Sequence, residues 1–136
     1  MDRLFINGEW REGAGARIVS IDPSTNETAF DAAAATRSET QEAVSAARAA
    51  FPAWATAPLE ARLDVMRRYK ALIERDADVL ARLISKETGK PYWETKTEAA
   101  AVAAKVDISI KAHEERTGFR ESIAAGSRAV LRHKPH

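Results

Sequence analysis

The sequence predicts an incomplete α/β fold, with extended segments at both ends and four helices between them. Three observations support this prediction. An Asn-Gly pair near the N-terminus separates two short apolar segments, which is the strongest local signal for a β-hairpin. Apolar residues recur at helical spacing through residues 36–118. After a loop, residues 127–133 return to an extended pattern, and this last strand has no obvious partner except the N-terminal strands.

The N-terminal extended segments begin with a hairpin. Asn7 and Gly8 both tolerate the positive φ angles of a type I′ turn, so the segments on either side of them should pair. Residues 17–21 alternate in part and are expected to form another strand. A turn cluster at residues 22–26 separates that strand from residues 27–32, which resume the extended pattern.

The helical region is expected to begin at Thr36. Thr36 and Glu39 match a capping box, in which each side chain satisfies a backbone N–H of the other residue. Pro52 is expected to end this helix, because proline lacks the N–H that continues a helix. A second helix is expected to start at Pro58, since proline suits the first helical turn.

Two more helices follow. The third is expected to run from Asp76 as its N-cap to Gly89 as its C-cap. The fourth is expected to start at Pro91 and to end at Gly118. Alanines crowd its middle, at residues 99–104, which lowers the free-energy cost of helix formation and lets neighbouring helices approach closely.

Composition excludes several classes of function. The chain has 136 residues, of which 21 are basic and 20 acidic, and a net charge of +1, so it lacks the charge excess of a nucleic-acid-binding protein. Its start does not read as a signal peptide and its apolar runs are too short for a membrane span, so a cytoplasmic protein without a membrane partner is expected. It contains no cysteine, which excludes disulfides, thiolate metal sites and thiol nucleophiles.

No cofactor-binding or metal-binding residue is predicted. Residues 13–17 lack the third glycine and the following helix of a dinucleotide-binding loop, so they indicate a plain turn. Residues 89–91 indicate a break between two helices rather than a phosphate loop. His133 and His136 lie three apart beside a proline, which favours two exposed histidines over a metal site.

A partly polar stripe on the fourth helix has two interpretations. Its members recur at helical spacing and are Glu98, Val102, Lys105, Ser109 and Arg116. Spacing alone favours a solvated face, because charged residues three, four or seven apart are ordinary neighbours on a helix surface. The alternative is a wall that faces a ligand.

Several segments together resemble the opening of the aldehyde dehydrogenase superfamily, and the match extends over essentially the whole chain. The segments are residues 4–10, the turn at 22–27, the helical stretch 46–54, Arg62, and Glu-Thr-Gly-Lys-Pro at 87–91 followed by Glu94 and Glu98. Within the superfamily, residues 105–118 and 129–136 resemble the N-succinylglutamate 5-semialdehyde dehydrogenases, enzymes of arginine catabolism.

The resemblance implies the N-terminal portion of an NAD-dependent aldehyde dehydrogenase. The family's nucleophilic cysteine, its water-activating glutamate, its oxyanion-binding asparagine and its glycine-containing cofactor loop all come later in the chain. No catalytic residue of the family therefore falls on this sequence, and the chain alone is expected to be inactive. NAD is expected in the complete enzyme, and no cofactor is expected for this chain alone.

The resemblance also assigns supporting roles to the segments. Residues 1–33 and 119–136 resemble strands of the family's oligomerisation sheet, and residues 36–118 resemble helices of the cofactor domain.

By the same resemblance, the fourth helix lines the substrate tunnel, with Val102 near a tunnel-facing position. Lys105, Ser109 and Arg116 continue that stripe. A lysine or arginine there could bind the extra carboxylate of a succinylated substrate through charge-assisted hydrogen bonds.

A stand-alone helical protein-interaction module is the alternative function. A portion of a larger enzyme would leave apolar helix faces uncovered, so it should self-associate or bind the rest of the dehydrogenase. Domain swapping through the terminal strand is one expected route. A true module should instead remain monomeric.

Overall fold

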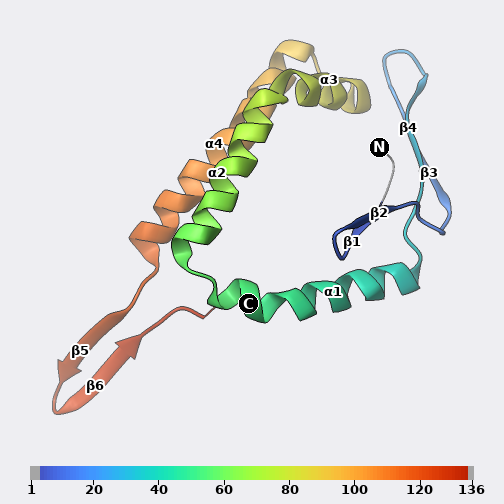
Figure 1. Cartoon of the computed structure of the whole chain (residues 1–136). Coiled ribbons are helices and arrows are strands. Elements are labelled where there is room, and N and C mark those ends of the chain that lie inside the picture. The colour runs from blue at the N-terminus through green and yellow to red at the C-terminus, as the bar shows by residue number, and fades with distance from the viewer. Residues whose placement is uncertain (1–3, 135–136) are drawn as a thin grey trace.

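The computed structural model describes residues 4–134, except for the side chain of Ala124, and it confirms the mixed α/β class. Helices α2 and α4 run side by side, α3 packs against α4, and a two-stranded arm extends beyond the end of α4 (Figure 1). In chain order the elements are β1 (Leu4–Ile6), β2 (Glu9–Arg11), β3 (Arg17–Ile21), β4 (Thr28–Ala33), α1 (Arg37–Thr56), α2 (Leu59–Arg75), α3 (Ala77–Thr88), α4 (Tyr92–Arg116), β5 (Arg120–Ala124) and β6 (Ser127–Leu131).

The predicted N-terminal strands are confirmed. Strands β1 and β2 pair in antiparallel fashion, and the turn residues Asn7 and Gly8 have φ angles of 53° and 86°, as a type I′ turn requires. Strands β3 and β4 form a second antiparallel pair. Gly13 and Gly15 pass so close to Ala34 that a Cβ on Gly13 would lie 2.3 Å from the carbonyl oxygen of Ala34. These two glycines therefore allow close backbone packing.

Helix α1 begins where the capping box predicts. The Thr36 hydroxyl accepts a hydrogen bond from the Glu39 backbone N–H at 3.2 Å, and the Glu39 carboxylate accepts one from the Thr36 backbone N–H at 2.7 Å. The prediction that Pro52 ends the helix is wrong, because α1 continues to Thr56. Pro52 removes only one backbone hydrogen bond of the helix, the one that its own N–H would have donated. The C-cap residue after Thr56 is Ala57, which has an extended ψ of 143°. Ala57 directly precedes Pro58, and a residue before a proline is disfavoured in the helical conformation.

The predicted starts of the later helices hold, but α4 ends at Arg116, before the predicted end at Gly118. Pro58 directly precedes α2, and Pro91 directly precedes α4. Asp76 occupies the N-cap position of α3, but its carboxylate accepts hydrogen bonds from the guanidinium of Arg75 rather than from a helix N–H. Gly89 ends α3 in the left-handed conformation with φ 75°, as a C-cap glycine does.

The C-terminal part differs from its prediction. Residues 127–131 form the expected strand, but its partner is β5, in a segment for which a loop was predicted. Ala125 and Gly126 join the two strands with φ angles of 50° and 77°, which places both turn residues in the left-handed region. Alanine is a poor indicator of such a turn, so the sequence did not reveal this hairpin. The last strand consequently pairs with β5 rather than with the N-terminal strands.

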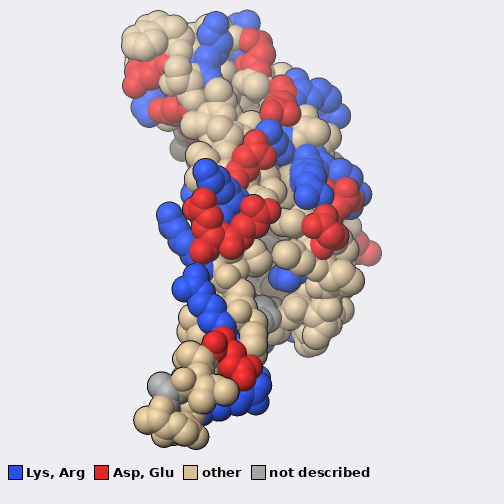
Figure 2. All heavy atoms as spheres, turned by 90° about the vertical axis from the view of Figure 1, so that its left-hand side faces the viewer, with Lys and Arg blue, Asp and Glu red and all other residues tan. Residues whose placement is uncertain are grey.

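The buried core is thin and follows one face of α4. Thr95, Ala99, Ala103 and Val106 are its buried residues, and they recur at the spacing of one helical face. The small alanines permit close contact with α2 and α3. The core is small for the amount of apolar surface, since large apolar side chains are exposed on every helix. The face shown in Figure 2 carries interspersed acidic and basic side chains, in keeping with the balanced composition.

Within residues 4–134, none of the helices combines the length and the apolar character needed to cross a membrane.

Candidate functional site

The predicted stripe on α4 lies on the surface. Val102, Lys105, Ser109 and Arg116 are all exposed, and Val102 keeps 40% of its accessible area. The stripe borders the buried face of the helix, because Val106 follows Val102 by four residues and is buried. The stripe therefore lies beside the packed face rather than opposite it, where it could form the wall of a binding site.

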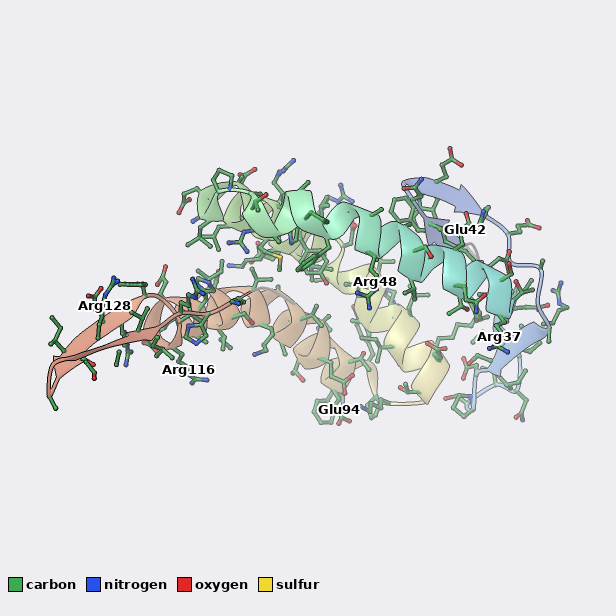
Figure 3. All side chains as sticks on the ribbon, turned by 90° about the horizontal axis from the view of Figure 1, so that it is seen from below. Arg37, Glu42, Arg48, Glu94, Arg116 and Arg128 are labelled. Atoms are coloured by element: carbon green, nitrogen blue, oxygen red, sulfur yellow. The ribbon has the colours of Figure 1, made fainter. Side chains whose placement is uncertain are left out.

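Among residues 4–134, the two cations of the stripe have no acidic partner. No carboxylate of another described residue lies within 4 Å of the side-chain nitrogens of Lys105 or Arg116. Figure 3 shows Arg116 near the base of the β5–β6 arm, whereas Glu94 lies at the other end of α4. Both cations are thus available to an anion that approaches this side of the helix.

Other charged groups of α4 form ion pairs with neighbouring parts of the chain. The Lys70 ammonium on α2 lies 2.6 Å from the Asp107 carboxylate, and this hydrogen bond raises the pKa of Lys70. Glu98, a member of the predicted stripe, forms an ion pair with Lys90, and this contact raises the pKa of Lys90. Glu98 therefore helps to hold the α3–α4 corner instead of facing a ligand.

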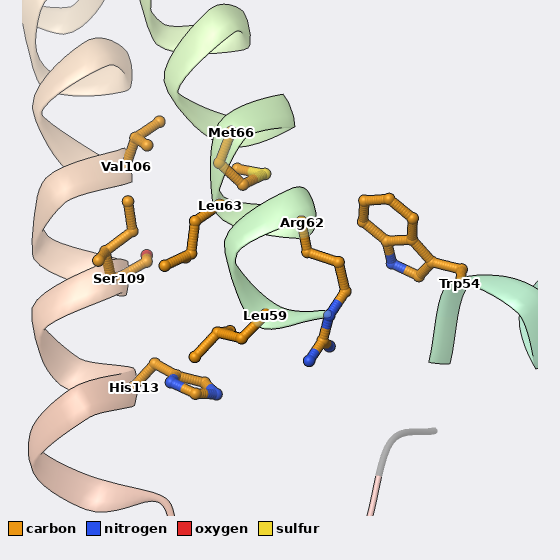
Figure 4. Close-up of a pocket in the computed structure, with 9 residues that line it drawn as sticks. Trp54, Leu59, Arg62, Leu63, Met66, Val106, Ser109 and His113 are labelled. Carbon is orange, nitrogen blue, oxygen red and sulfur yellow. The ribbon is translucent and has the colours of Figure 1, made fainter. Parts of the chain in front are cut away.

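A groove lies where α1, α2 and α4 meet, and Ser109 is the one member of the predicted stripe on its wall (Figure 4). Its volume is about 200 Å³. The lining residues are Trp54, Leu59, Arg62, Leu63, Met66, Val106, Ser109, Ile110 and His113. Trp54, Arg62, Ser109 and His113 supply the polar groups of this lining, and none of its described residues is acidic. The groove therefore suits an apolar occupant that carries hydrogen-bond acceptors.

The structure does not bring the whole predicted stripe to this groove. Val102, Lys105 and Arg116 lie outside its lining. His113 was missed by the sequence reasoning, although its position four residues after Ser109 on a helix could have revealed it. Trp54 could not have been found this way, because only the bend between α1 and α2 brings it to the groove.

The described residues offer no metal centre, and the pair Gly13 and Gly15 does not form a dinucleotide-binding loop. Between residues 4 and 134, no three histidine, aspartate or glutamate side chains lie close enough to share a metal ion. Gly13 and Gly15 pack on the backbone of Ala34, so this glycine pair does not frame a phosphate group.

Comparison with known proteins places the chain in a family. The model of the aldehyde dehydrogenase family matches residues 10–136. The chain is 50% identical over 133 residues to N-succinylglutamate 5-semialdehyde dehydrogenase 2 of Caulobacter vibrioides, a match that covers 98% of this chain and 27% of that protein.

Solved structures agree with this assignment. The crystal structure of a succinate-semialdehyde dehydrogenase from Burkholderia pseudomallei matches 92% of this chain and 26% of its own, with a TM-score of 0.82 and 27% sequence identity. A betaine aldehyde dehydrogenase from Staphylococcus aureus, solved with NAD+, matches 92% of this chain and 25% of its own, with a TM-score of 0.81 and 25% identity.

The chain spans about a quarter of the length of the relatives that it matches, 27% in the case of the Caulobacter protein. The family model nevertheless covers nearly all of the chain, and both the superfamily resemblance and the narrower resemblance to succinylglutamate semialdehyde dehydrogenases are confirmed. The chain belongs to the aldehyde dehydrogenase family.

Proposed function

We propose that this chain is the N-terminal portion of an NAD-dependent enzyme that oxidises N-succinylglutamate 5-semialdehyde to the corresponding acid. The observation that carries the proposal is the 50% identity, over 98% of the chain, to a protein named for that substrate. An NAD+ complex of a related aldehyde dehydrogenase supports the choice of cofactor. In this proposal, the cofactor binds to the part of the enzyme that the relatives carry beyond this match.

The contribution of this chain to the reaction is substrate selection and assembly. Lys105 and Arg116 meet the additional carboxylates of the succinylated substrate by charge-assisted hydrogen bonds, with Val102 and Ser109 on the same wall. The exposed position of both cations, without a described acidic partner, supports this role. Residues 1–33 and 119–136 serve as strands for assembly of the enzyme.

The chain alone is inactive in this proposal. It contains no cysteine, and thiolate attack on the aldehyde is the step on which the family's chemistry depends. Its partners are the rest of the dehydrogenase polypeptide or further copies of itself, because the exposed apolar side chains on its helices favour association.

A chimera tests the proposed activity. Residues 1–136 of this chain replace the matching quarter of the Caulobacter protein, which retains its own remaining sequence. We expect NADH formation from N-succinylglutamate 5-semialdehyde with a kcat/KM within about tenfold of the Caulobacter protein assayed in parallel, which corresponds to about 1.4 kcal/mol of transition-state stabilisation. A folded chimera that turns over only neutral aldehydes contradicts the assigned substrate.

A further inference from the structure

Another pocket lies at the base of the β5–β6 arm, where the C-terminal end of α4 meets the segment that follows β6. Its volume is about 240 Å³, and most of its lining side chains are exposed. Two imidazoles and one guanidinium line it from these two parts of the chain, and none of its six lining residues is acidic. The lining residues are His113, Thr117, Gly118, Phe119, Arg132 and His133.

The surroundings of this pocket are strongly basic. Residues 116–134 contain five basic residues and one acidic residue, an excess of four positive charges, whereas the whole chain has a net charge of +1. The acidic residue, Glu121, is already paired with Arg128. Among residues 4–134, no carboxylate lies within 4 Å of the Arg132 guanidinium. The pocket therefore offers positive charge to an anion from solution.

The charged and titratable groups on the elements that meet at the pocket are mostly basic. Glu115 on α4 lies 3.8 Å from Lys111 rather than in the pocket. On α2, Arg62 lines the neighbouring groove together with His113. The remaining groups on α4, β5 and the segment after β6 are Glu114, Arg116, Arg120, Glu121, Arg132 and Lys134.

Hydrogen bonds within the pocket decide which groups remain for a ligand. The carbonyl oxygen of His113 accepts hydrogen bonds from the backbone N–H and the hydroxyl of Thr117, at 3.0 Å and 2.7 Å, so this carbonyl is satisfied. Nδ1 of His133 lies 3.4 Å from the carbonyl oxygen of Gly118. Because a carbonyl oxygen only accepts, Nδ1 carries the proton in this contact. The neutral ring then presents a lone pair at Nε2, whereas the charged ring presents an N–H donor there.

We propose that this pocket binds the phosphate group of a small ligand, and that binding is coupled to protonation of His133. The Arg132 guanidinium donates paired hydrogen bonds to phosphate oxygens, and the imidazoles of His113 and His133 add donors. A tetrahedral oxyanion has acceptor oxygens in several directions, so it suits donors that come from two chain segments better than a planar carboxylate does. This site goes beyond the proposed function and does not depend on aldehyde oxidation.

Phe119 bears on the source of the phosphate. Its ring lines the same pocket and keeps 63% of its accessible area. An exposed aromatic ring beside the basic groups could contact the organic part of a phosphate ester. Free phosphate would use the basic groups alone, so the two sources differ in their dependence on Phe119.

A sulfate titration of the 136-residue chain tests the site, because sulfate keeps its two charges between pH 6 and pH 8. Sulfate replaces sodium chloride at constant ionic strength, and NMR follows the backbone amide shifts at protein concentrations below the onset of association. We expect saturable shifts confined to residues 113–119 and 132–134. The affinity should be about tenfold higher at pH 6 than at pH 8, because the imidazoles gain their second N–H as the pH falls.

Two arginine variants separate the site from general electrostatic attraction. Arg132→Gln should weaken sulfate binding by about tenfold or more, through the loss of charge-assisted hydrogen bonds. Arg120→Gln is the matched control, because it removes the same charge from β5 outside the pocket lining, and its affinity should stay within about twofold. Replacing both His113 and His133 with Gln should abolish the pH dependence. Unchanged amide shifts in α2 and α3 verify that each variant keeps the fold.

Four results overturn the proposal. They are shifts that grow linearly without saturation, equal weakening by Arg120→Gln and Arg132→Gln, equal sulfate affinity at pH 6 and pH 8, and binding of the planar dicarboxylate succinate at least as tightly as sulfate. The unmodified chain alone decides the first, third and fourth of these. None of the measurements uses dehydrogenase activity, so their failure leaves the proposed function standing.

Inorganic phosphate and phenyl phosphate, compared at pH 7, identify the source. Tighter binding of phenyl phosphate that is lost in Phe119→Ala supports a phosphate ester as the ligand. Equal affinities of the two compounds support free phosphate. If neither compound displaces sulfate from the pocket, the assignment to phosphate is overturned.

Discussion

The ammonium of Lys70 on α2 lies 2.6 Å from the carboxylate of Asp107 on α4, and this contact ties these two adjacent helices together. Glu74 adds a second acidic neighbour at 3.5 Å from the same ammonium. Both groups raise the pKa of Lys70, the hydrogen bond with Asp107 being the largest cause. The pair links residues that are 37 apart in the sequence.

This ion pair predicts how stability changes at alkaline pH. Because the pKa of Lys70 is raised in the folded chain above its ordinary value of 10.5, the stabilisation is fully present below that value and is lost as the pH rises through the folded pKa. Asp107→Asn should lower Tm by a few degrees at pH 8 and flatten the fall of Tm above pH 10, measured by circular dichroism. The control is Asp64→Asn, which breaks only an exposed pair with Arg68 on one helix. An identical pH profile for Asp107→Asn and the unmodified chain contradicts this role.

Lys105 should affect substrate preference rather than chemistry. In the chimera, Lys105→Met should raise KM for the succinylated semialdehyde by about tenfold, the effect of losing one charge-assisted hydrogen bond. The kcat should stay within about twofold, since in the proposed function Lys105 binds a carboxylate of the substrate and not the aldehyde group. The matched control is Lys111→Met, because Lys111 is an exposed lysine on the same helix that lies near Glu115. The readout is the ratio of kcat/KM for the succinylated semialdehyde to kcat/KM for a neutral aldehyde. If Lys105→Met leaves this ratio unchanged, the wall of α4 does not select anionic substrates.

The turn of the β5–β6 hairpin should respond in opposite directions to two substitutions. Ala125 has a φ of 50°, so Ala125→Asn places a residue that tolerates this region and should slow amide exchange along β5 and β6. Gly126 has a φ of 77° with open space around it, so Gly126→Ala should destabilise the hairpin by about 1–2 kcal/mol through backbone strain alone. Hydrogen exchange by NMR measures both effects. Faster exchange in Ala125→Asn would show that the left-handed conformation at position 125 does not limit the stability of the hairpin.

The chain by itself should associate in solution. Exposed apolar side chains lie on every helix, and the β5–β6 arm presents Ile123 and Leu131 to solvent. Light scattering at several protein concentrations should therefore give an average mass that rises with concentration. A monomeric mass that stays constant, together with cooperative unfolding, would favour the stand-alone interaction module instead.

The elements whose causes are local can be predicted from the sequence. The Thr36 and Glu39 capping box, the type I′ turn at Asn7 and Gly8 and the glycine that ends α3 each depend on residues within one turn, so their residue types predict them. The family resemblance can also be recognised from the sequence, because each motif is a short continuous segment and the motifs follow one another in the family's order.

The remaining features became visible only in the structure, because their local signals are weak or because they join segments that lie far apart in the chain. The strand β5 forms because β6 folds back on it across a turn with weak local signals. The groove brings Trp54, Arg62 and His113 together from three helices, and no spacing within one helix could place them side by side.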